Sequence, residues 1–280
     1  MLKMSNAFQL VMPSLADGTR PNITTQGVQI TPGNNTYPAY AEIMSDTLVT
    51  ADAYLIDICF NSSAVSTQNR DTIVTIGFDF AGGTTYTDME INHLLASCAQ
   101  VLGGGATGIW YRFPIRIPAG TSIAAKASVN NATVGNISVY CILYGKPSRP
   151  ELVRAGTFVR TYGATTATSQ GTVITPGGVS EGAYTDLGTL ADDIWAWEFG
   201  YGVDDTTIVS QLLFVDIGVG STQKVVLANG IVCSATNESV NKPIALSYGD
   251  AKSGEHVYGR AQSSGAADTN VSLMAYGVGG

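Results

Sequence analysis

The sequence predicts an all-β protein of two tandem β-sandwich or jelly-roll domains, related by internal duplication and preceded by an extended N-terminal arm. Two observations lead to this fold. Short runs that alternate between apolar and polar residues are separated by turn residues, and helical patterns are scarce. The second half of the 280 residues also repeats the first, since Gly-Val-Gln-Ile-Thr-Pro-Gly at 27–33 returns as Gly-Thr-Val-Ile-Thr-Pro-Gly at 171–177.

The repeat continues towards the C-terminus, with an offset that falls from 144 to 134 residues. Trimming of loops between retained strands would shorten the offset in such steps. The other matched pairs are Tyr40 and Tyr184, Ala51-Asp52 and Ala191-Asp192, the frame Asp79/Gly83/Asn92 and the frame Asp216/Gly220/Asn229, 120–127 and 254–261, and 136–139 and 270–273. We therefore predict a first sandwich over residues 27–147 and a second over 171–280.

The sequence of the first half predicts the following elements, from the N-terminus onwards. Residues 1–26 are polar and irregular, and we expect an extended arm that a neighbour orders. Period-two alternation then predicts half-buried strands over 72–80 and 109–117. A Pro-Ala-Gly turn at 118–120 leads into a further strand over 122–129, because Pro presets φ and Gly tolerates a positive φ.

The second half follows a linker over residues 148–170, which Pro147 just before it and Pro150 near its start stiffen. The same rhythm of alternation predicts strands over 207–218, 224–234 and 270–276. One segment of the first half is ambiguous, since residues 93–97 could form a helical turn. Its repeat counterpart favours a strand, and we predict a strand at both places.

Composition excludes several classes of partner. Charged residues make up only 13% of the chain, and its net charge is −8. Nearly all of the acidic excess lies in residues 151–280, where 13 Asp and Glu accompany 6 Lys and Arg. Without a basic cluster, neither nucleic acid nor an anionic membrane is expected as a partner. No apolar run approaches the ~18 residues of a membrane span, and we expect the chain to fold in a cytoplasm.

The sequence offers little support for catalysis. Neither His93 nor His256 recurs in the other half, and neither accompanies a nucleophile motif. Glu90 or Glu198 could contribute to the carboxylate pair of a glycosidase, but their repeat counterparts are not acidic. We therefore predict a protein that is not an enzyme and that holds no cofactor.

The four cysteines are predicted to be free thiols. They form no CxxC pair, and two of them lie inside apolar runs that are typical of strands. The four residues are Cys59, Cys98, Cys141 and Cys233. Buried thiols fit this pattern better than disulfides or a zinc site.

Two sets of residues carry alternative interpretations as sites. Asp79 and Asp216 each precede a glycine by four residues, so their carboxylates could contribute to calcium sites. An Asx-type turn, in which the carboxylate accepts backbone N–H groups, is the favoured interpretation. Trp195 and Trp197 lie two residues apart and would share one strand face, where they could form a glycan-binding platform. Two tryptophans on one face more often fill a core or a subunit interface.

The strand–turn patterns at 113–126 and 215–220, together with the Thr-Pro-Gly stretches that open the repeats, resemble a known family. This family comprises virion structural proteins of tailed bacteriophages with tandem β-sandwich repeats. The second half departs from its Ile-Pro-Ala-Gly turn, since Asp-Ala-Lys-Ser-Gly stands at 250–254.

The resemblance implies a non-enzymatic part of the virion, assembled in the host cytoplasm. A capsid decoration or cement protein is the expected role, with the major capsid protein or other virion proteins as partners. The chain would be a homo-oligomer, with a trimer favoured. One alternative is a double jelly-roll major capsid protein. The other is a tail, collar or fibre module that binds host glycans through Trp195 or Trp197.

Overall fold

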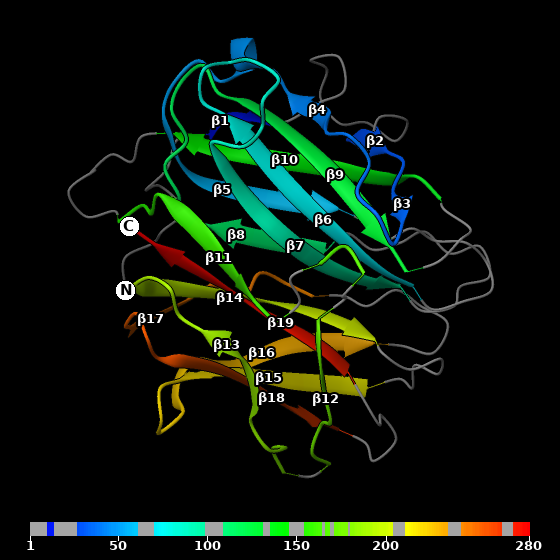
Figure 1. The fold of residues 1–280 in the computed structure, drawn as a ribbon, viewed down its shortest axis with the longest axis vertical. Coiled ribbons are helices and arrows are strands. Elements are labelled where there is room, and N and C mark those ends of the chain that lie inside the picture. The colour runs from blue at the N-terminus through cyan, green and yellow to red at the C-terminus, as the bar shows by residue number, and fades with distance from the viewer. Residues whose placement is uncertain are drawn as a thin grey trace.

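The protein consists almost entirely of β-strands, arranged in two lobes one above the other (Figure 1). The computed structural model describes residues 10–13, 27–60, 70–98, 109–130, 135–145, 154–163, 166–168, 171–178, 180–203, 211–234, 242–264 and 271–280. Within these ranges, no helix is long and apolar enough to cross a membrane. The chain is thus all-β, as the alternation of its residues predicts.

The first lobe is formed by two sheets that face each other. Sheet A1 has the order β1-β10-β5-β8, with β2 also paired to β10, and sheet B1 has the order β4-β9-β6-β7, with β3 also paired to β9. The strands are β1 Leu10–Pro13, β2 Val28–Ile30, β3 Gly33–Asn34, β4 Ala41–Met44, β5 Ala53–Phe60, β6 Arg70–Asp79, β7 Met89–Cys98, β8 Ile109–Phe113, β9 Ser122–Val129 and β10 Ile137–Gly145. Leaving aside β1 and the short β3, eight strands in two four-stranded sheets make a jelly roll.

The second lobe has the same strand order. Sheet A2 is β11-β19-β14-β17 with β12 on β19, and sheet B2 is β13-β18-β15-β16. The strands are β11 Phe158–Tyr162, β12 Thr172–Ile174, β13 Thr185–Thr189, β14 Ile194–Val203, β15 Gln211–Val219, β16 Lys224–Ser234, β17 Ser247–Ala251, β18 His256–Ser263 and β19 Val271–Gly279. Even the parallel pairing of β3 on β9 has a counterpart, a bridge between Gly177 and Gln262.

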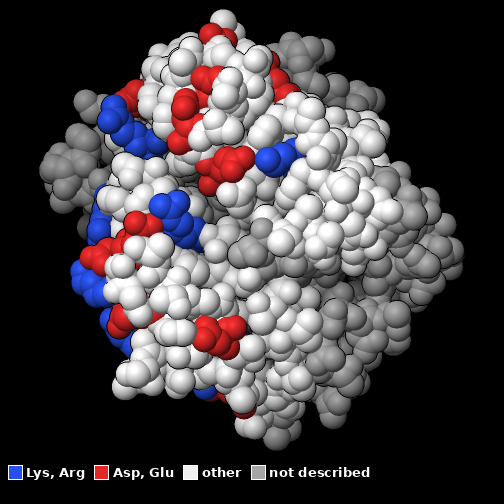
Figure 2. Space-filling model, viewed as in Figure 1, with Lys and Arg blue, Asp and Glu red and all other residues white. Residues whose placement is uncertain are grey.

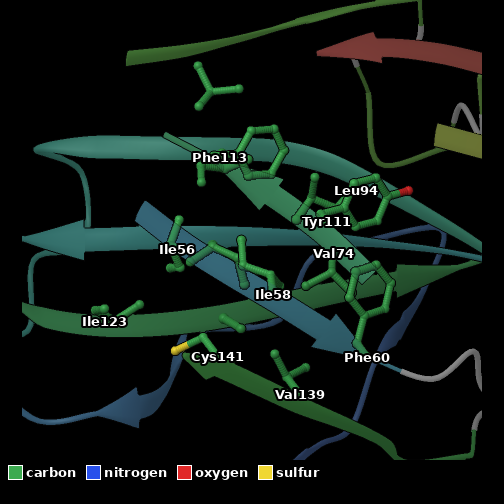
Figure 3. Close-up of a cluster of buried hydrophobic side chains, with 14 of the residues drawn as sticks. Ile56, Ile58, Phe60, Val74, Leu94, Tyr111, Phe113, Ile123, Val139 and Cys141 are labelled. Carbon is green, nitrogen blue, oxygen red and sulfur yellow. The ribbon is translucent and has the colours of Figure 1, made fainter. Parts of the chain in front are cut away.

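The core of the first lobe lies between sheets A1 and B1. Apolar side chains point into it from both sheets, and Figure 3 shows those of β5, β8 and β10 facing Val74 and Leu94 of sheet B1. The strand over 109–117 is shorter than predicted, because β8 ends at Phe113, directly before Pro114. The segment 93–97 lies in strand β7, so the strand prediction is confirmed there.

The arm and the linker each contribute a strand. Within the predicted arm, β1 pairs with β10, and within the predicted linker, β11 pairs with β19. The two strands occupy the same place in their lobes, at the edge of sheets A1 and A2. The domain boundaries at 27, 147 and 171 stay predictions, as does the duplication itself.

The two lobes share one apolar core. The cluster that fills the first lobe also contains residues from the outer face of sheet A2, namely Val159, Trp195, Ala196, Met274, Tyr276 and Val278. A separate cluster fills the interior of the second lobe. Sheet A2 is therefore covered on both faces, and one continuous apolar cluster spans the junction between the lobes.

Candidate functional site at the junction of the two lobes

The edge strand β7 lies on the outer face of sheet A2, and side chains from sheets A1 and A2 bind its free backbone groups. The hydroxyl of Tyr276 accepts the N–H of Leu95 at 3.0 Å and donates to the carbonyl of His93 at 2.6 Å. The hydroxyl of Tyr111 donates to the carbonyl of Leu95, and Thr161 Oγ1 donates to Asn92 O at 2.6 Å. An edge that would otherwise present unpaired groups is thus satisfied without a further strand.

Gly200 on β14 allows this close approach. A Cβ atom at Gly200 would lie 3.1 Å from Leu95 Cβ and 3.1 Å from the Tyr111 hydroxyl, and it would also collide with the Tyr276 hydroxyl. The glycine is thus required for packing, since its φ lies outside the left-handed region. Any side chain here would push β7 away from the sheet.

A buried ion pair lies beside this contact. Lys242 Nζ is 2.9 Å from Glu198 Oε1, and the two side chains are 1% and 0% exposed. The ammonium also donates to Trp110 O of the first lobe at 3.1 Å and lies 4.2 Å from the centre of the Tyr111 ring. Backbone N–H groups of Phe199 and Ala245 donate to the carboxylate. The pair therefore links β14 of the second lobe to β8 of the first.

Burial acts on both partners of this pair. Desolvation raises the pKa of Glu198 and lowers the pKa of Lys242, while the attraction between the two groups opposes both shifts. Each group needs the other, because an isolated charge at this depth would be strongly disfavoured.

A cavity of about 630 Å³ opens between β7 and β11, at the rim of the junction. Two of its charged groups pair with each other: Lys126 Nζ lies 3.3 Å from Glu90 Oε1, and the Tyr40 hydroxyl donates to the same carboxylate. The ammonium also lies 4.2 Å from the centre of the Tyr40 ring and 5.3 Å from that of Tyr37. These contacts favour a structural role for the charged residues of the cavity over a catalytic one. Glu198 does not line the cavity, so the two glutamates considered for glycoside hydrolysis are not brought together there.

His93 lies at the edge of this cavity in a β-bulge of β7. Its φ is +59°, its ring is edge-on to Tyr37 with centroids 5.7 Å apart, and its two ring nitrogens have no hydrogen-bond partner among the described residues. Burial, with a smaller contribution from Lys126, lowers the pKa of His93 from 6.5 to about 4. The imidazole is therefore neutral at neutral pH.

The second lobe has the same bulge, with Asn229 in the place of His93. Asn229 has a φ of +53°, and its N–H is accepted by Asp216 as that of His93 is accepted by Thr75. The sequence match of Asn92 with Asn229 is thus wrong by one residue. Asn and His are both among the few non-glycine residues that adopt a left-handed conformation readily.

The structure also corrects the match between Asp79 and Asp216. The register of the sheets makes Asp79 equivalent to Gly220 and Asp216 equivalent to Thr75. Asp79 ends β6 and accepts the N–H groups of Ala81 at 3.0 Å and Thr85 at 2.8 Å, in an Asx-type turn.

Asp216 lies inside β15 instead of at its end. Its Oδ2 is 2.8 Å from a guanidinium nitrogen of Arg260. Within the described ranges, no three His, Cys, Asp or Glu side chains come together as a metal site would require. Calcium binding by either aspartate stays the less favoured and untested alternative.

The two tryptophans lie on opposite faces of β14, contrary to the expectation of a shared face. A bulge between Ile194 and Ala196 shifts the alternation by one residue. Trp195 therefore packs in the shared core, stacked on Tyr248 with centroids 6.0 Å apart, while Trp197 lies in the core of the second lobe. The indoles are 4% and 0% exposed, so neither presents the open ring face of a sugar platform.

Sequence reasoning missed the residues that hold the junction. Lys242 and Tyr276 belong to no motif, and neither recurs in the first half. Of the four predicted thiols, Cys59 and Cys141 form no disulfide among the described residues, and the side chains of Cys98 and Cys233 lie outside the described part.

Comparisons with known proteins leave the family open. No protein-family model matches the chain, and no curated protein matches it. The fold is similar to a chain in the structure of broad bean stain virus, with 7% identity and a TM-score of 0.35, over 98% of this chain and 90% of that one.

Two further solved structures are similar at the same low level. A chain of naturally occurring empty particles of cowpea mosaic virus has 9% identity and a TM-score of 0.29, over 93% of this chain and 95% of that one. Tripeptidyl peptidase 2 has 7% identity and a TM-score of 0.28, over 95% of this chain and 23% of that one. Likenesses with such TM-scores carry no argument about function.

Proposed function

We propose that the chain is a non-enzymatic structural component of a bacteriophage particle, a decoration or cement protein that stabilises the capsid. The supporting observation is the continuous junction between the lobes. A shared apolar core, a hydrogen-bonded strand edge and a buried ion pair hold two jelly rolls in a fixed relation. A rigid two-lobed block suits a protein whose task is to hold neighbours in place.

The surface fits the same role. Figure 2 shows charged side chains gathered over the left and upper parts of one face, whereas uncharged residues form the described surface on the right. Burying uncharged groups against a neighbour avoids the desolvation penalty of charges. Of the charged groups that line the cavity, Lys126 pairs with Glu90 and Arg160 pairs with Asp192, which supports a structural interpretation over a catalytic one.

Quantitative mass spectrometry of purified particles tests the proposal. We expect this chain in a ratio near one to the major capsid protein. A few copies per particle would point to a tail or collar, and absence from the particles would overturn the virion role. Mild stripping of the particles then separates two roles, because loss of a decoration protein leaves a closed shell.

A double jelly-roll major capsid protein is the second candidate. The favouring observation is that both lobes have the jelly-roll strand order. If this candidate is right, the chain itself will be the most abundant protein of the particle, and the shell will not survive its removal. The glycan-binding alternative gains no support, since both indoles are buried.

A further inference from the structure

We propose that the edge strand β16 of one copy docks on the outer face of sheet A1 of a second copy. The contact would repeat between chains the contact that β7 makes with sheet A2 within the chain. This inference concerns self-association alone and holds whether or not the chain belongs to a phage particle.

The argument starts from one pair of neighbouring residues that occurs in both lobes. Ile73 and Leu95 are cross-strand partners on the outer face of sheet B1, and the register of sheet B2 puts Phe214 and Ile231 at the same two places. Both places are apolar in both lobes. Ile73 and Leu95 are fully buried, because the second lobe covers them.

In the second lobe the same two places are open. Ile231 is 42% exposed, and Phe214 is only partly buried. Two other apolar residues nearby, Val225 on β16 and Leu212 on β15, are also exposed. An outer sheet face with this pattern, beside a long edge strand, is a surface that proteins normally cover. A second copy is the partner that carries the matching face.

That matching face is the outer side of sheet A1, the counterpart of sheet A2. The pairing registers of the two sheets place Cys59 at the position of Gly200, and Ile142 at the position of Tyr276. Sheet A1 therefore has small and apolar residues at the positions where sheet A2 contacts β7. The outward-facing Tyr140 and Ile142 are partly exposed. Sheet A1 therefore offers β16 an apolar surface at the place where sheet A2 receives β7.

Both receiving faces also contain one buried carboxylate with a basic partner. Asp57 is the counterpart of Glu198, and it is 2.6 Å from Arg112 Nε, as Glu198 is close to Lys242. The Tyr144 hydroxyl donates to the same carboxylate at 2.9 Å. Since the charge is already satisfied, a partner can cover this face without leaving an unpaired ion.

The two proposed surfaces lie on different lobes, so the contact is head-to-tail. Each copy would present β16 to one neighbour and sheet A1 to another. Such a heterologous contact forms a closed ring if the rotation between copies closes, and an open filament if it does not.

Analytical ultracentrifugation of the full chain, from low concentration to about 100 μM, tests the proposal with three matched lysine variants. Ile231→Lys alters the β16 edge, Tyr140→Lys alters the receiving face, and Val173→Lys places the same charge on an exposed valine of β12, away from both. We expect each of the first two to weaken association about tenfold or more, because a charge replaces apolar surface at the contact. Val173→Lys should associate like the unaltered chain. Thermal melting of every variant verifies that it folds.

A mixture of the first two variants distinguishes the head-to-tail contact from other arrangements. One intact β16 edge and one intact sheet A1 remain in the mixture, so it should form dimers and nothing larger. If Ile231→Lys abolishes association and Tyr140→Lys leaves it unchanged, β16 meets another β16 and the proposal is wrong. It is equally overturned if the unaltered chain stays monomeric or if Ile231→Lys associates normally.

Discussion

Replacing Lys242 by Met should destabilise the protein strongly, although the new side chain is apolar and of similar length. The change leaves the carboxylate of Glu198 without its cation at a site that is 0% exposed. It also removes the hydrogen bond from the ammonium to Trp110 O and the contact with the Tyr111 ring, both of which join the lobes. The variant thus tests whether the junction depends on this ion pair.

The expected size follows from the burial of the pair. Removing one partner of a fully buried ion pair lowers the free energy of unfolding by about 3–5 kcal/mol, because an uncompensated charge is left behind. For a chain of this length such a loss lowers the melting temperature by roughly 10 °C. The double variant Lys242→Met with Glu198→Gln removes both charges, and we expect it to recover at least half of the loss.

Equilibrium unfolding in guanidinium chloride, followed by fluorescence and circular dichroism, measures these differences. Lys252→Met is the matched control, since Lys252 pairs with Asp193 at 2.7 Å on the surface, where the lysine side chain is 72% exposed. A loss below about 1 kcal/mol for Lys242→Met, or a double variant no more stable than the single one, would refute the reasoning.

Four further predictions concern the junction and the aspartates. Because burial lowers the pKa of His93 to about 4, its contribution to stability is present above pH 6.5 and falls as the pH decreases towards 4; His93→Asn should therefore remove about 2 kcal/mol of acid sensitivity between pH 7.5 and 5, measured by unfolding at both pH values. Tyr276→Phe should lower the free energy of unfolding by about 1–3 kcal/mol, because it leaves backbone groups of β7 unpaired, and an unchanged midpoint of denaturation would contradict this. Gly200→Ala should lower the melting temperature more than the same change at the open turn glycine Gly178, since only the first lies under β7. Calcium should not raise the melting temperature relative to EDTA, because Asp79 and Asp216 already bind backbone N–H groups and a guanidinium; a rise that Asp216→Asn abolishes would show a calcium site.

The alternation of apolar and polar residues was sufficient to predict the fold class. Each lobe buries one face of every sheet in its core, and successive residues of a strand point to opposite faces. The predicted strands over 122–129 and 224–234 coincide with β9 and β16. The sequence similarity of the two halves also indicated that they have the same strand order. These features depend on neighbours within one sandwich, and the pattern of a single strand records them.

Sequence patterns failed at a bulge and at a connection of different length. Alternation alone puts Trp195 and Trp197 on one face, but the bulge between Ile194 and Ala196 moves the later side chains of β14 to the other face. The match of Asp79 with Asp216 fails for a different reason, because the connection from β6 to β7 is longer than the connection from β15 to β16. Residues that coincide at a constant offset are therefore not equivalent, because the offset changes from one strand to the next.

The junction could not be predicted, because it depends on contacts between lobes. The Tyr276 hydroxyl binds β7 from 181 residues away in the chain, and the cation that Glu198 requires comes from a segment without a motif. Neither interaction leaves a periodic signal. A buried glutamate in an apolar strand was nevertheless a clue, since such a group requires a partner.

The differences between the lobes follow from their positions at this junction. Where sheet A2 receives β7, it has Gly200 for close approach and a tyrosine hydroxyl for the strand edge, whereas sheet A1 has Cys59 and Ile142 at the same places. Those two residues of sheet A1 form no hydrogen bonds to a strand edge within the described chain. No strand of the described chain packs there, so the position does not require a hydroxyl group. The lobes thus share the strand order that builds each core, and they differ at the places where one lobe is covered and the other is open. The open places, on β16 and sheet A1, are therefore the ones at which contact with another chain should be sought first.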